Sequence, residues 1–306
     1  MSDMPISRIV AYDIIICIPV HGPSTVLNKT INRVNEIFKD EIDKILLVIS
    51  NSGKHIENIP WVGPLEILNL SSNVYWTGAV KAMFSYVESI NSKYVLLLNH
   101  DCIPAQNSIK ILKDTMEIYD KKAICHAVLI RLDNYAIAWW AGNIHKRWNI
   151  QYSKEFYDIN ICCLPTKPFQ TLSTMGQCLL LPHEAAKAKY LDEKKTPHYW
   201  GDSAMTSNMR RDGYKLLIVP NAHAFTDQSD YAKKIERIKC RKITDIKRVY
   251  FEKSSNRYLS GAFWGMLAQY DNLLFGILAG LFYTSGKIIK GLSEIVMWNF
   301  HKNNIR

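Results

Sequence analysis

The chain has no Cys-x-x-Cys pair, no internal repeat and no low-complexity segment among its 306 residues. Its seven cysteines are scattered, and only Cys162 and Cys163 are adjacent, so we expect neither a zinc site nor a disulfide framework. An odd cysteine count suits a reducing cytosol. The first five residues lack the basic and apolar regions of a signal peptide, so we expect a cytoplasmic protein.

Acidic residues are scarce in the last quarter of the chain. From Tyr231 onward there are 14 lysines and arginines against 5 acidic residues, which gives +9 of the net charge of +10. A basic segment beside apolar helices indicates an anionic membrane surface rather than nucleic acid. We therefore expect no nucleic-acid partner and a peripheral location at the inner face of the plasma membrane.

Apolar strands alternate with amphipathic helices through the first hundred residues. Strands are expected at 13–18, 44–50, 65–70 and 94–98, and helices at 24–38 and 77–90. This alternation predicts an α/β fold with a parallel sheet and right-handed crossovers.

The rest of the chain is more mixed. The pattern predicts strands at 123–130, 172–181 and 214–219, an extended aromatic segment at 135–143, a loop at 164–168 and a helix at 203–212. After Ser229 it predicts a basic helix to about Asn256 and apolar helices at 262–268, 273–283 and 288–300. The apolar run at 273–282 has only ten residues, too few to span a bilayer, so we expect interfacial or packed helices, or a re-entrant segment.

A carboxylate follows the buried strand at 94–98. Asn99-His100-Asp101 closes this strand, and ligands bind at the carboxyl ends of strands in open α/β sheets. An oxygen ligand there suits Mg²⁺ or Mn²⁺ carrying a diphosphate. An Asx turn leading into Pro104 is the structural alternative.

Thr77 and Gly78 open a predicted helix, where free N–H groups and the helix dipole favour phosphate. The alternative is an ordinary threonine cap with Trp76 in the core. Lys81, one turn further along, either adds positive charge for a diphosphate or is solvated.

Four segments at strand ends together resemble the family-two, GT-A-fold nucleotide-sugar glycosyltransferases, and in particular the rhamnosyltransferase-like branch that builds bacterial surface polysaccharide such as O-antigen. The likeness extends from about residue 13 to residue 228, and its segments are 14–21, 73–80, 98–101 and 197–202 with Gly213-Tyr214. It implies a GT-A-type, Rossmann-like, mostly parallel sheet flanked by helices. The implied organisation is a catalytic domain at 1–229, with a nucleotide-binding half at 1–102 and an acceptor-binding half at 103–229, and a helical region at 230–306.

The resemblance also implies roles for single residues. Asp101 inherits the metal-bound carboxylate, and Asp202 inherits the general base on the acceptor hydroxyl, although Asp202 could instead be only a helix cap. The expected contacts to the nucleotide-sugar are Pro19, His21, Ser50, Asn73, Trp76, Thr77, Gly78, Lys81 and Asn99.

Several positions depart from the family pattern. Ser50 stands where an Asp often reads the base, and Lys81 where an Asn is common. Ala204 and Asn208 replace an acidic residue and an arginine. The identity of the nucleotide base is therefore left open, and UDP- or dTDP-linked sugars are the donors expected first.

Several further residues are weaker candidates for the site. Trp139-Trp140 offers a stacking face to an acceptor sugar or belongs to the core, and Gly176 allows close approach to the donor sugar. His100 and His223 are candidate further metal ligands, and Asp192-Glu193 is expected in a solvated loop.

These observations predict an inverting, metal-dependent hexosyl- or deoxyhexosyltransferase with a nucleoside-diphosphate sugar donor and a lipid-linked saccharide acceptor. A sugar nucleotidyltransferase is a weaker alternative, because the segment at 19–24 lacks the Gly-rich loop with a basic residue. A non-catalytic GT-A subunit or scaffold is a second alternative, favoured by the departures at Ser50, Ala204 and Asn208. The C-terminal helices are expected to bind membrane, to pack on the catalytic domain or to form a homodimer contact.

Overall fold

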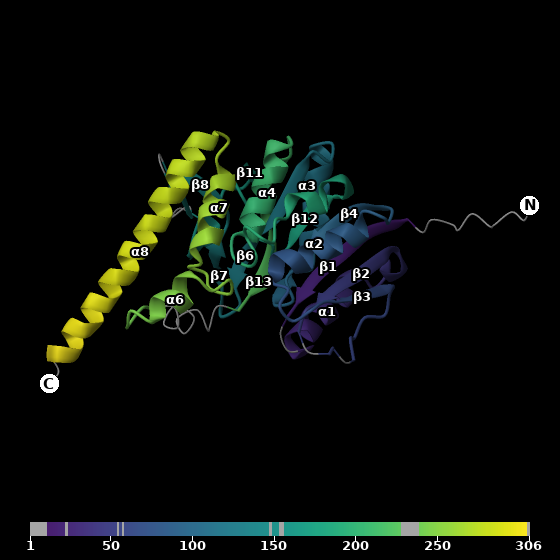
Figure 1. The fold of residues 1–306 in the computed structure, drawn as a ribbon. Helices are drawn as coiled ribbons and strands as arrows, with labels where there is room; N and C mark the ends of the chain where they lie inside the picture. Colours follow the sequence, from purple (N-terminus) through teal and green to yellow (C-terminus); the bar gives the residue numbers. More distant parts are fainter. Residues whose placement is uncertain are drawn as a thin grey trace, which may run out of the picture.

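The computed structural model describes residues 11–21, 24–53, 55–56, 58–146, 149–152, 156–227 and 239–304. Within them an eleven-stranded mixed sheet forms the centre of the molecule (Figure 1). Its main path runs β10-β7-β6-β12-β4-β1-β2-β3, and β13 pairs with β6, β5 and β11.

The first half of the sheet is parallel, as the alternation of strands and helices predicts. Strand β1 pairs with β2 on one side and β4 on the other, and β3 extends the sheet beyond β2. The elements are β1 (Tyr12–Val20), α1 (Ser24–Phe38), η1 (Ile42–Lys44), β2 (Ile45–Asn51), β3 (Leu65–Asn69), α2 (Trp76–Val87) and β4 (Ser92–Leu97).

The second half contains the antiparallel strands. β12 lies antiparallel between β4 and β6, β13 lies parallel to β6, and the short β5 lies antiparallel to the end of β13. The elements are β5 (Cys102–Pro104), α3 (Ser108–Ile118), β6 (Ala123–Arg131), β7 (Asn134–Trp140), β8 (Asn143–Lys146), β9 (Asn149–Tyr152), β10 (Ile159–Asn160), η2 (Ile161–Cys163), β11 (Phe169–Gln170), β12 (Leu179–Pro182), η3 (His183–Ala185), η4 (Ala188–Tyr190), α4 (Gly201–Arg211) and β13 (Lys215–Thr226).

Two predicted strands have different bounds in the structure. The strand expected at 172–181 is only β12, because the residues before Leu179 leave the sheet and contact α4, where Thr174 N–H donates to Thr206 Oγ1 (3.0 Å). The strand expected to end at Val219 continues to Thr226. Pro220 is tolerated because the register with β6 shifts between Val219 and His223, at a bulge where no ladder hydrogen bond is needed.

Helices cover both faces of the sheet. α1 and α3 pack on one face, and α2 and α4 pack on the other (Figure 1). Alternate residues of β1 and β2 enter the two cores, since side chains alternate along a strand. The candidates Pro19, Ser50 and Asn99 lie at or just after the carboxyl ends of β1, β2 and β4.

The C-terminal region contains α6 (Asp245–Tyr250), α7 (Leu259–Gln269) and α8 (Leu273–Asn304). The single basic helix expected at 229–256 is wrong for its described part, where only α6 is helical before Phe251 and turns follow. Residues 228–238 lie outside the described residues. They include Lys233, Lys234 and Arg237, three basic residues of the helix predicted there.

The two apolar stretches expected at 273–283 and 288–300 form one 32-residue helix, α8. By length and composition the stretch Leu273–Phe300 could cross a membrane, with a mean hydropathy of 1.4 and 17% of its most apolar window buried. α8 lies at the edge of the molecule beside α7, and its far end extends past α6 (Figure 1). Because no proline interrupts 273–304, the polar residues around Lys287 do not end the helix.

Candidate active site

Trp76, the first residue of α2, contacts the metal-type motif at the end of β4. Its indole Nε1–H donates to Asn99 Oδ1 (3.1 Å). The turn after Asn99 is held from the other side, because Thr30 Oγ1 on α1 donates to the His100 carbonyl (2.8 Å). Asp101 follows in this turn with an exposed side chain that makes no hydrogen bond or ion pair to any described residue. A fixed turn therefore presents a free carboxylate at the sheet edge.

Gly176 links this motif to the second carboxylate. The indole of Trp76 lies so close that a Cβ on Gly176 would be 2.1 Å from a ring carbon, so only glycine fits. The Gly176 N–H donates to Asp202 Oδ2 (3.1 Å). Asn99, Trp76, Gly176 and Asp202 thus form one continuous chain of contacts, which joins residues that the sequence assigned to the donor and to the acceptor side.

Asp202 lies in the first turn of α4 and is half-buried. Its Oδ1 accepts a hydrogen bond from the Ser203 N–H (2.7 Å). Burial raises the pKa of the Asp202 carboxyl, against the opposing effect of the Gly176 and Ser203 N–H groups. A carboxylate with a raised pKa accepts a proton more readily than an exposed one, as a general base must.

The start of α2 is covered by the loop at 192–197. Thr77 is buried, its N–H donates to the Pro197 carbonyl (3.1 Å) and its Oγ1 donates to the Thr196 carbonyl. A Cβ on Gly78 would lie 2.7 Å from Glu193 Oε2, so a carboxylate of the chain itself occupies the position predicted for phosphate. The sequence does not predict this position of Glu193, because the pattern at Asp192-Glu193 indicates only a solvated loop.

Lys81 pairs with this same carboxylate. Its Nζ lies 3.5 Å from Glu193 Oε1, and both side chains are largely exposed. Asn73 is exposed in the turn before α2. The loop at 192–197 therefore contacts Thr77, Gly78 and Lys81 at the start of α2.

The ends of β1 and β2 bring Pro19 and Ser50 together in register. Ser50 is fully buried, and its Oγ has no hydrogen-bond partner among the described residues. His21 Nδ1 lies 3.1 Å from both the carbonyl and the hydroxyl oxygen of Ser52. The Ser50 hydroxyl and the His21 imidazole thus offer polar groups near the predicted base site.

His198 is a neighbour that the sequence did not single out. Its ring lies 4.5 Å from the Tyr199 ring and 6.0 Å from the Tyr75 ring, measured between centroids. Burial and the charge of His21 both lower the pKa of His198. The imidazole is therefore neutral at neutral pH and belongs to the wall between the β1 end and the start of α2.

The residues present fit a divalent ion that arrives with its substrate. No cluster of three or more His, Cys, Asp or Glu side chains that could hold a metal occurs among the described residues. Mg²⁺ commonly takes one or two carboxylates and completes its shell with phosphates and water. Asp101 supplies one carboxylate, and the pairing of Thr226 with Cys102 brings the end of β13, followed by Asp227, beside it.

His223 is held by hydrogen bonds to Pro220 and Ser108 rather than to Asp101. Its ring Nε2 lies 2.8 Å from the Pro220 carbonyl, and its backbone N–H donates to Ser108 Oγ (2.8 Å). The imidazole is bound within the bulge of β13.

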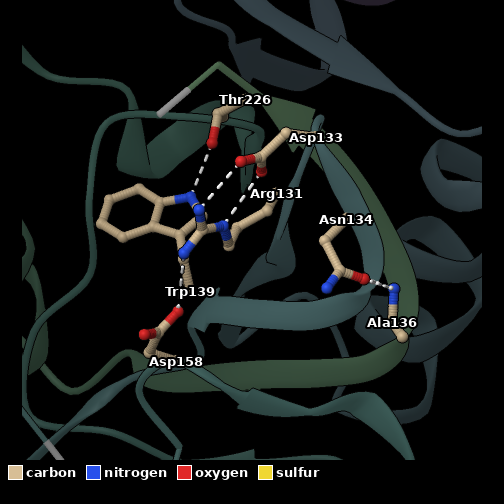
Figure 2. Close-up of polar contacts among 7 residues, drawn as sticks. All are labelled: Arg131, Asp133, Asn134, Ala136, Trp139, Asp158 and Thr226. Atoms are coloured by element: carbon tan, nitrogen blue, oxygen red, sulfur yellow. Dashed lines mark hydrogen bonds and ion pairs between the residues drawn. The ribbon is translucent and has the colours of Figure 1, made fainter. Parts of the chain in front are cut away.

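The two neighbouring tryptophans have different environments. Trp140 is fully buried with its ring edge-on to His126, so it belongs to the core. Trp139 is half-buried, and its Nε1–H donates to Thr226 Oγ1 (2.6 Å), as Figure 2 shows. In the same view Arg131 pairs with Asp133 (2.8 Å) and Asp158 (3.3 Å). These contacts fasten the β6–β7 hairpin to the end of β13, next to the strand that follows Asp101.

The sheet, with a carboxylate motif after β4 and a half-buried carboxylate at the start of α4, defines the GT-A class of nucleotide-sugar glycosyltransferases. The chain belongs to glycosyl transferase family 2, whose sequence pattern matches residues 15–174, more than half of its length. No curated protein matches the sequence.

A solved structure with a similar fold is the crystal structure of GalNAc-T7 with UDP, GalNAc and Mn²⁺. The TM-score is 0.52 at 12% sequence identity, and the match covers 95% of this chain but 58% of that one. At this identity the likeness shows the GT-A fold alone. The chain is thus a GT-A-fold glycosyltransferase, and its substrates are the subject of the proposal below.

Proposed function

We propose that this protein is an inverting, metal-dependent glycosyltransferase that moves a hexosyl or deoxyhexosyl group from a nucleoside-diphosphate sugar to a lipid-linked saccharide in bacterial surface polysaccharide synthesis. The observation that carries the proposal is the contact chain from Asn99 through Trp76 and Gly176 to Asp202. It joins the motif beside a free carboxylate to a half-buried carboxylate suited to accept a proton.

The residues have separate tasks in this reaction. Pro19, His21 and Ser50 face the base, and Asp101 would hold the Mg²⁺ or Mn²⁺ that accompanies the diphosphate. The bound ion would neutralise charge on the departing diphosphate. Asp202 takes the proton of the acceptor hydroxyl as the oxygen bonds to the anomeric carbon, while the bond to the diphosphate breaks on the opposite face and inverts the centre. The similar crystal structure contains UDP and Mn²⁺, which supports a UDP- or dTDP-linked donor here.

The long apolar helix supports a peripheral location at the cytoplasmic membrane surface. Thirteen exposed large apolar side chains lie along α8: Leu273, Leu274, Phe275, Leu278, Leu281, Phe282, Ile288, Ile289, Leu292, Val296, Met297, Trp298 and Phe300. The charged Glu294 turns inward to Arg257 (2.8 Å), whereas Lys290 stays exposed among these apolar side chains. A lipid-linked acceptor would lie in the same surface.

Donor binding tests the proposal most directly. We expect one class of UDP-, dTDP- or GDP-sugar to raise the melting temperature in the presence of Mn²⁺, since a ligand of the folded state stabilises it by about 2.7 kcal/mol at 100 times its Kd. Asp101→Ala should abolish the metal-dependent part of this shift and nearly all transfer. The matched control is Asp114→Ala, which removes an exposed carboxylate of α3.

Two outcomes would contradict the proposal. An Asp101→Ala protein that binds donor with unchanged metal dependence would show that the metal lies elsewhere. Donor binding without turnover in the parent protein would favour a non-catalytic subunit instead.

A further inference from the structure

Trp200, two residues before Asp202, has a left-handed backbone. Its φ is +72° and its ψ is −6°, a region that bulky residues rarely occupy. Such a conformation persists only where the surroundings impose it. The contacts of the Trp200 side chain therefore identify what holds the start of α4.

Those contacts come from the C-terminal helices. A Cβ on Gly265 of α7 would lie 2.6 Å from Trp200 Cβ and 2.8 Å from two further atoms of that side chain. Tyr283 of α8 meets the Trp200 ring edge-on, with centroids 5.4 Å apart and planes at 81°. With Met266 and Ala279 these residues form a small apolar cluster that contains Trp200 and both helices of the α7–α8 hairpin.

The far end of α4 is bound to the same helix. Arg210 Nη2 donates to the Gln269 carbonyl (3.0 Å) and pairs with Asp271 (2.9 Å), and Arg211 donates to the Ala268 carbonyl. Guanidinium groups thus satisfy the carbonyls at the end of α7, which lack partners within the helix. α7 therefore holds α4 at both of its ends.

Fixing Trp200 fixes Asp202. The Trp200 carbonyl accepts the Ala204 N–H (2.9 Å), one of the first bonds of α4. A Cβ on Gly201 would lie 2.0 Å from Thr77 Oγ1, so the chain has no room to shift toward α2. Between these two constraints the Asp202 carboxylate can reach the Gly176 N–H.

We propose that Trp200 is a positioning residue, through which the α7–α8 hairpin sets the orientation of the Asp202 carboxylate. The C-terminal helices are then part of the acceptor-side active centre as well as a surface element. The inference rests on the proposed role of Asp202 as the base.

Gly265→Ala tests the inference, because it places a methyl group against the Trp200 Cβ, next to the backbone. We expect kcat for transfer to fall at least tenfold, the donor KM to stay within twofold, and the acidic limb of the kcat–pH profile to move. The Ala204 amide should exchange hydrogen faster. Gly286→Ala makes the same change in α8, where a Cβ meets nothing within 4 Å, and should retain parent values.

Substitutions of Trp200 itself give the second comparison. Trp200→Phe keeps an aromatic ring for Gly265 and Tyr283 and should retain most of kcat, whereas Trp200→Ala should lose at least tenfold. If Gly265→Ala does not fold, Tyr283→Ala, which removes the edge-on ring, is measured in its place.

The outcomes separate the inference from the proposed function. Parent kcat, parent pH profile and unchanged Ala204 exchange in Gly265→Ala would overturn the positioning role. Faster exchange throughout the chain, with an unmoved pH profile, would also overturn it, since that is a general loss of stability. If Asp202→Asn, assayed in parallel, turns over normally, the role of Asp202 as base fails whatever the Gly265 result.

Discussion

Asp202 should give the enzyme its acidic pH limit. Burial raises the pKa of this carboxyl, and a base works only when deprotonated, so kcat should decline with falling pH at a higher pH than an exposed aspartate would allow. Asp202→Asn keeps the shape but cannot take a proton, so kcat should fall roughly 10²–10⁴-fold and the acidic limb should disappear, with donor affinity little changed. Near-normal turnover would reduce Asp202 to a helix cap.

His126 makes a prediction about stability rather than activity. It is fully buried against Trp140, and desolvation lowers its pKa to about 4. Above the ordinary pKa near 6.5 the imidazole is neutral in both states. As the pH falls from there toward 4, only the unfolded chain takes up the proton, so stability declines by at most about 3 kcal/mol.

His126→Leu should remove this decline. The free energy of unfolding in urea, compared between pH 7 and pH 4.5, should fall by about 2 kcal/mol more in the parent than in the variant. The exposed residue His55 supplies the control, as His55→Leu should behave like the parent. Equal losses in the parent and in His126→Leu would show that another group governs acid stability.

At the scale of elements, strands β1 to β4 and helices α1 and α2 follow from sequence periodicity, because each is a local apolar pattern that ends at turn residues. Periodicity fails where tertiary contacts decide the structure. The residues before Leu179 leave the sheet, where Thr174 bonds to α4, and α8 continues through Lys287, whose carbonyl accepts a hydrogen bond from Tyr250 Oη (2.6 Å).

The prediction at the scale of elements concerns the start of α2. Glu193 places a carboxylate over Gly78, where a helix N-terminus favours negative charge. If donor phosphate binds there, Glu193→Gln should tighten donor binding about two- to fivefold, the effect of about 0.3–1 kcal/mol, as measured by calorimetry. Glu36→Gln on the outer side of α1 is the charge-matched control. Unchanged or weaker binding in Glu193→Gln would show that the start of α2 does not receive the phosphate.

At the scale of the whole molecule, the sequence singled out Asp101, Asp202 and Trp76 as candidates but did not predict the contacts that link Trp76 to Asp202. Each of the three lies near the end of a strand or at the start of a helix, where sequence motifs are easiest to recognise. Gly176 beneath the Trp76 ring and Glu193 above Gly78 depend on chain segments about 100 residues away, so no local pattern reveals them. The pairing of Glu294 with Arg257, 37 residues away, is likewise not visible in the local pattern of α8.

The last prediction concerns the exposed apolar side chains of α8. The stretch Leu273–Phe300 is about 42 Å long at 1.5 Å per residue, and basic residues such as Lys247 and Arg248 on α6 are exposed nearby in the chain. In liposome flotation the full chain should float with anionic vesicles, less so at high salt, because each basic residue near an anionic surface adds about 1 kcal/mol. Alkaline carbonate should release a peripheral protein and retain one whose α8 spans the bilayer. The double variant Phe282→Glu with Ile289→Glu should stay unbound, because it charges the exposed face of α8, whereas Ser254→Glu, outside α8, should still float. If the parent protein stays in the lipid-free fraction with every vesicle, the apolar face of α8 serves assembly rather than membrane attachment.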